Sequence, residues 1–128
     1  MKKILTLLTI VILSVSLQAK ATVSFEDAFK ESTTKPMLVL VYAQWADDYE
    51  TYLKTFKSAQ NEFGDKFNYV ELNIASADTK FFNSRYHIYP NLPYVLMFRD
   101  GGKISRYVPN NCADKEACLL PKIKTFLY

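Results

Sequence analysis

The sequence contains few of the residues from which catalytic and metal sites are commonly built. Its 128 residues include one histidine, two cysteines, three glycines and five prolines. The single histidine, His87, excludes a zinc site made of several histidines. The scarcity of glycine and proline argues against a flexible linker, a collagen-like tract or a low-complexity segment. No glycine-rich phosphate loop, serine nucleophile elbow or zinc-ligand spacing is present.

Apolar and aromatic residues, in contrast, are abundant. Hydrophobic residues make up 49% of the chain and aromatic residues 15%, with nine tyrosines and nine phenylalanines. This amount is sufficient for one ordinary core and is too aromatic for a disordered chain. The length is that of a single domain.

The first 21 residues have the pattern of a secretory signal peptide. Two lysines precede the apolar run Ile4–Leu17, and an A-x-A cleavage motif ends at Ala21. The run is shorter than the roughly 20 residues that a membrane-spanning helix needs. We therefore favour a cleaved bacterial Sec signal, cut after Ala19 or Ala21, over an uncleaved anchor. The expected product is a periplasmic or secreted domain, residues 22–128, without a stable membrane anchor.

This segment also carries the excess positive charge. The chain has 16 basic and 13 acidic residues, a formal charge of +3. Removal of Lys2, Lys3 and Lys20 leaves thirteen basic residues against thirteen acidic ones, so the mature domain is formally neutral. Because no basic cluster with interleaved aromatic residues appears either, we expect no nucleic-acid partner.

Helical and strand patterns alternate along the mature chain. Helices are expected from Phe25 to before Thr33, at Ala46–Phe63, at Ala77–Tyr86 and at Asp114–Tyr128 with a break or start at Pro121, and strands at Met37–Ala43, Phe67–Ile74, Tyr94–Arg99 and Lys103–Val108. Strands separated by helices pair in parallel, and the D-G-G turn after Arg99 predicts a hairpin. These patterns predict an α/β fold with a small mixed central sheet flanked by helices, ending in a β-hairpin and a helix.

Three stretches in this order resemble the thioredoxin-fold family. They are "VLVYAQWADDYE", "YVELNI" and "NLPYVLMFRDGGKISRYV". The first resembles the strand and W-C-G-P-C-K motif of the family, and the last its cis-proline loop and closing hairpin. The resemblance covers Phe25–Tyr128 and implies a thioredoxin-like fold.

The resemblance also shows where this chain departs from the family's redox motif. Trp45 matches the tryptophan before the first cysteine, but the two redox cysteines map onto Ala46 and Tyr49. The residues between them are Asp47 and Asp48. Disulfide exchange needs a thiolate and a second sulfur to resolve the mixed disulfide. We therefore expect no catalytic residues here, and we expect the two aspartates to cap the N–H groups of the following helix.

Three further positions of the family pattern can be compared with this chain, and two of them are changed while one is kept. The buried acid maps onto Leu40 and a lysine of the next strand onto Glu71. The family's cis-proline maps onto Pro93, preceded by Leu92, although the segment before it is one residue longer than usual.

The resemblance implies a groove for a protein or an extended peptide, used in binding or in a chaperone-like role. Its candidate residues are Trp45, Asp47, Asp48, Tyr49, Leu92, Pro93 and Tyr94. The resemblance also places Tyr52, Tyr86 and Tyr89 near this groove. Backbone next to the cis-proline can pair with an extended peptide by strand addition. A metal site at Asp47, Asp48 and Glu50 lacks the geometry of a recognised loop, so we expect neither metal nor cofactor.

Cys112 and Cys118 are the only cysteines, and their six-residue spacing is not C-x-x-C. In an oxidising compartment we expect a structural disulfide between them. The alternative is a relocated redox pair, which would make the protein a thiol–disulfide oxidoreductase. The sequence leaves the question of enzymatic activity open between these two hypotheses.

Overall fold

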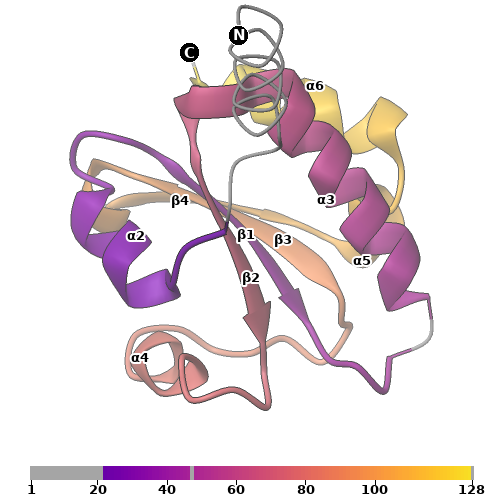
Figure 1. Cartoon of the computed structure of the whole chain (residues 1–128), viewed down its shortest axis with the longest axis horizontal. Helices are drawn as coiled ribbons and strands as arrows, with labels where there is room; N and C mark the ends of the chain where they lie inside the picture. The colour runs from indigo at the N-terminus through magenta and orange to yellow at the C-terminus, as the bar shows by residue number, and fades with distance from the viewer. Residues whose placement is uncertain (1–21, 47, 128) are drawn as a thin grey trace, which may run out of the picture.

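Four strands form one mixed sheet at the centre of the protein (Figure 1). The computed structural model describes residues 22–46 and 48–127. The strands are β1 (Met37–Tyr42), β2 (Asn68–Asn73), β3 (Tyr94–Arg99) and β4 (Ile104–Val108), in the sheet order β2-β1-β3-β4. β1 pairs with β2 in parallel and with β3 antiparallel, and β3 pairs with β4 antiparallel.

Helices cover both faces of this sheet (Figure 1). They are α2 (Phe25–Glu31), α3 (Tyr49–Phe63), α4 (Thr79–Asn83), α5 (Asn110–Ala113) and α6 (Glu116–Leu127). Side chains alternate along β1, so Leu38 and Leu40 pack with α3, α5 and α6 in one core cluster. Met37, Val39 and Val41 pack with α2 and α4 in the other. The expected α/β fold with a mixed sheet flanked by helices is confirmed.

Several helix boundaries differ from the predicted ones. α3 begins at Tyr49 rather than at Ala46, because Asp48 has a left-handed backbone with φ of 65°. α4 covers only Thr79–Asn83, within the longer helix expected there. α6 begins at Glu116 and continues through Pro121 without the expected break, although proline removes one helical N–H donor.

The final hairpin confirms the predicted turn and shows why it contains glycine. Asp100–Gly102 form a 3₁₀ turn between β3 and β4. Gly102 has φ of +87°, and a Cβ atom there would lie 2.7 Å from Phe29 Cε2. A side chain at this position would therefore collide with the core below α2.

The predicted signal peptide, residues 1–21, lies outside the described residues, as do Asp47 and Tyr128. In the described part of the chain, no helix combines the length and the apolar character needed to cross a membrane.

Candidate binding site

The segments that the sequence predicts to form a groove meet at one end of the sheet. Val41, near the end of β1, lies opposite Tyr94, the first residue of β3, in the antiparallel ladder. The loop after β1 therefore emerges next to Leu92 and Pro93, whose peptide bond is cis. The fold thus places the tryptophan loop and the proline loop in the same region.

A surface hollow of about 330 Å³ lies in the loop between β1 and α3. Its lining residues are Gln44, Trp45, Ala46, Asp48, Tyr49, Glu50 and Thr51. Trp45 is 71% exposed, whereas Ala46 and Tyr49 are half-buried. Ala46 and Tyr49, which the sequence resemblance aligns with the redox cysteines of the family, therefore line a single open hollow.

Asp48 does not act as the predicted cap. Its backbone lies in the left-handed region, and its side chain makes no hydrogen bond to the helix N–H groups. A capping residue ordinarily has an extended backbone, which directs its side-chain oxygen back toward those groups. Here only the Asp48 carbonyl takes part, accepting from the Thr51 N–H at 2.9 Å. The second aspartate in this prediction, Asp47, lies outside the described residues.

Tyr49 is held in place by a neighbouring tyrosine. Its ring stacks on that of Tyr42 at a centroid distance of 5.8 Å and an interplanar angle of 8°. Burial raises the pKa of Tyr42, and the nearby carboxylate of Glu71 raises it further. Glu71 lies 3.9 Å from the Lys57 ammonium. Leu40, which matches the family's buried acid, is fully buried in the core.

The proline side of the predicted groove offers fewer side chains than the sequence suggests. Pro93 and Tyr94 are buried, and Leu92 is half-buried against the core. None of the three lines the hollow beside Trp45. The Tyr94 hydroxyl accepts a hydrogen bond from the Tyr89 N–H at 3.1 Å. The Tyr94 side chain is therefore a core element and is not available to a partner.

Two other tyrosines on this side are exposed. The rings of Tyr89, Tyr94 and Tyr107 lie within 4.7 to 5.4 Å of one another, and we call these three residues the tyrosine cluster. Tyr89 is 44% exposed and Tyr107 38%. Burial raises the pKa of Tyr94 to about 12, although the hydrogen bond from Tyr89 opposes this shift. Sequence reasoning missed Tyr107, for which the only sign was its place on the predicted strand Lys103–Val108.

Cys112 and Cys118 form a disulfide bond, as predicted, with a sulfur–sulfur distance of 2.05 Å. The bond ties the short helix α5 to α6, and Cys112 is only 4% exposed. α5 also contacts α3, since the Tyr52 hydroxyl donates to the Asn110 carbonyl at 3.0 Å. Neither cysteine lines the hollow beside Trp45.

Across residues 22–46 and 48–127, no three histidine, cysteine, aspartate or glutamate side chains come together in a way that could hold a metal ion.

Comparison with known proteins identifies the fold. No protein-family model and no curated protein matches the sequence. Among solved structures, a chain of the complex between ferredoxin:thioredoxin reductase and thioredoxin f2 is similar, with a TM-score of 0.65 and 18% identity over 81% of this chain and 88% of that one. Malassezia sympodialis thioredoxin (Mala s 13) is similar with a TM-score of 0.63 and 17% identity over 87% and 94%. The protein therefore has a thioredoxin-like fold.

Proposed function

We propose that this protein is an exported thioredoxin-fold module that engages a protein or extended peptide in the cell envelope, in a binding or chaperone-like role, without exchanging disulfides at the family's usual position. The main supporting observation is the hollow after β1. There Ala46 and Tyr49, which the sequence resemblance aligns with the redox cysteines of the family, line the hollow beside a tryptophan that is 71% exposed. The predicted signal peptide supports export.

The chemistry of the site supports a role without disulfide exchange. Exchange begins with attack by a thiolate and ends when a second thiol resolves the mixed disulfide. Alanine and tyrosine can perform neither step. The position of the buried acid is taken by Leu40, which is fully buried and apolar.

The other pair of sulfurs fits a structural bond better than the alternative, an oxidoreductase acting through Cys112 and Cys118. An attacking thiolate must reach one sulfur in line with the disulfide, so reactive cysteines are at least partly accessible. Cys112 is 4% exposed in the core between α3, α5 and α6, and Cys118 is half-buried.

The exposure of three aromatic side chains supports a role in binding a protein or peptide. Tryptophan and tyrosine are enriched at protein interfaces, because they bury a large area and lose little conformational freedom. Trp45 lies in the loop after β1 and Tyr89 and Tyr107 belong to the tyrosine cluster, and all three are substantially exposed. The backbone around the cis peptide bond at Pro93 could pair with an extended segment.

Site-specific photo-cross-linking in the native cell envelope tests this proposal. A benzophenone amino acid replaces Trp45 in one variant and Asn61 in a control variant. Asn61 is exposed near the C-terminal end of α3, whereas Trp45 lies in the loop before the N-terminal end of that helix. We expect a discrete cross-linked species from position 45 that is absent from position 61. Equal cross-linking at both positions, or none at 45, would contradict a binding face at Trp45.

A further inference from the structure

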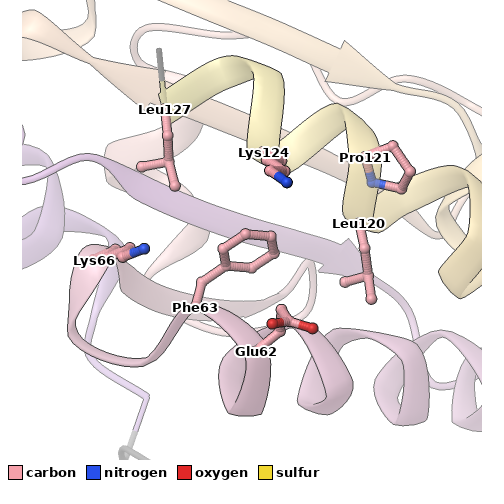
Figure 2. A pocket seen from close by; sticks show the side chains of 7 residues that line it. All are labelled: Glu62, Phe63, Lys66, Leu120, Pro121, Lys124 and Leu127. Carbon is pink, nitrogen blue, oxygen red and sulfur yellow. The ribbon is translucent and has the colours of Figure 1, made fainter.

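A second hollow lies away from the Trp45 region, between the C-terminal end of α3 and α6 (Figure 2). Its volume is about 470 Å³, within the roughly 300–1,000 Å³ typical of small-molecule sites. The lining residues are Glu62, Phe63, Lys66, Leu120, Pro121, Lys124 and Leu127. We propose that this hollow binds a single-chain amphipathic carboxylate, of the fatty-acid type.

The floor of the hollow is apolar. Figure 2 shows the Phe63 ring in the middle, with Leu127 toward one end and Leu120 toward the other. Phe63 is 8% exposed, and Leu120 and Leu127 are half-buried. Pro121 lies in α6 and adds an apolar ring to the wall. This lining provides a surface for a short alkyl chain, whose burial is favourable because it removes apolar area from water.

The charges of the rim favour an anionic head group. Lys66 and Lys124 both line the hollow, and the Lys66 side chain points inward from the Leu127 end in Figure 2. Neither lysine forms an ion pair with any carboxylate of the described residues. Glu62, the only acidic lining residue, lies beside Leu120 in this view. Among the described residues both ammonium groups are therefore available to an anion, Lys66 at the Leu127 end and Lys124 above the Phe63 ring in this view.

A third cation lies close to this end. Lys66 and Leu127 also line an adjoining hollow of about 330 Å³, whose wall includes Arg99. The Arg99 guanidinium lies over the Phe126 ring, 5.2 Å from its centroid. The same wall also includes Asp100, so apart from the shared Lys66 this second hollow adds one cation and one anion, and no net charge, beside the Leu127 end.

Titration with decanoate, followed by NMR, tests the proposal. We expect the NMR signals of Phe63, Leu120 and Leu127 to shift and the signals of residues around Trp45 to keep their positions. Decanol, which has the same chain without the charge, should bind more weakly. The double variant Lys66→Gln/Lys124→Gln should weaken decanoate binding by roughly twofold to thirtyfold, the range for two solvent-exposed ion pairs, and should leave decanol binding unchanged.

A matched variant controls for general charge effects. Lys103→Gln/Lys122→Gln removes the same charge from two exposed residues that do not line the hollow, Lys103 just before β4 and Lys122 in α6. It should bind decanoate as the unmodified protein does. Absence of decanoate binding, equal affinity for decanol, or equal weakening by both double variants would overturn the proposal. None of these outcomes bears on cross-linking at Trp45, so this inference and the proposed function can fail separately.

Discussion

Asp48 illustrates what is decided by a single backbone angle. Its φ of 65° ends the loop after Trp45 and delays the start of α3 until Tyr49. Two consecutive aspartates before a helical pattern resemble a capping sequence, and this is why the sequence alone predicted capping. A left-handed conformation cannot be read from residue types, because aspartate adopts both backbone conformations.

The angle leads to a prediction for Asp48. A glycine accepts this conformation without steric cost, whereas alanine does not, and the aspartate side chain makes no capping bond that would be lost. We expect Asp48→Gly to be more stable than Asp48→Ala by about 1 kcal/mol. Urea denaturation of the two variants measures the difference. Equal midpoints would show that the backbone angle carries no strain.

Burial also separates residues that look alike in sequence. Tyr94 and Tyr107 each lie in a strand of the final hairpin, but only Tyr94 is fully buried. β3 is a central strand with a partner on each side, while β4 is an edge strand. The side chain of a tyrosine is compatible with either position, so the sequence could not show which of the two would be exposed to solvent.

At the scale of elements, the strands were predicted more closely than the helices. All four strands lie within one or two residues of the expected ranges, because continuous apolar runs bounded by turn residues mark them clearly. The short helix α5 was not predicted, since four residues carry no detectable period. Its position depends on tertiary contacts, namely the disulfide to α6 and the hydrogen bond from Tyr52.

The disulfide between these elements should matter for stability. The loop closed by Cys112 and Cys118 is short, and removal of such a crosslink costs roughly 2–3 kcal/mol in the chain-entropy model. We expect Cys112→Ala/Cys118→Ala to lower the free energy of unfolding by this amount, as measured by urea denaturation. The unmodified protein in dithiothreitol serves as the control and should be similarly destabilised. A variant of unchanged stability would contradict a structural role.

For the molecule as a whole, the order of elements was enough to predict the fold. β1 and β2 pair in parallel because a helix, α3, joins them. β3 and β4 pair antiparallel because a short turn joins them. The candidate site was predicted only in part. Trp45, Ala46, Asp48 and Tyr49 share a hollow, but the hollow between α3 and α6 depends on packing between segments distant in sequence.

The tyrosine-rich core gives the protein a characteristic response to alkali. Burial raises the pKa of several tyrosines, among them Tyr42, Tyr52, Tyr86 and Tyr94. In the unfolded chain these groups ionise near pH 10. In the folded protein burial raises the pKa of Tyr94 to about 12. Between pH 10 and about 12 the unfolded state therefore binds fewer protons than the folded state, and the free energy of unfolding falls as the pH rises.

We therefore expect the urea midpoint to be lower at pH 11 than at pH 9, and this contribution of the tyrosines to be fully present at pH 9 and below. Tyrosine ionisation, followed by absorbance at 295 nm, should begin at lower pH in urea than in buffer. Identical ionisation curves in the two conditions would contradict the burial of these hydroxyl groups.

The central claim is that a thioredoxin fold is used here for binding rather than for disulfide exchange. Reduction of insulin by dithiothreitol, with and without the protein, measures exchange activity most directly. We expect the rate to equal that of dithiothreitol alone. A faster rate would contradict the claim, and its loss in Cys112→Ala/Cys118→Ala would identify the protein as an oxidoreductase acting through that pair.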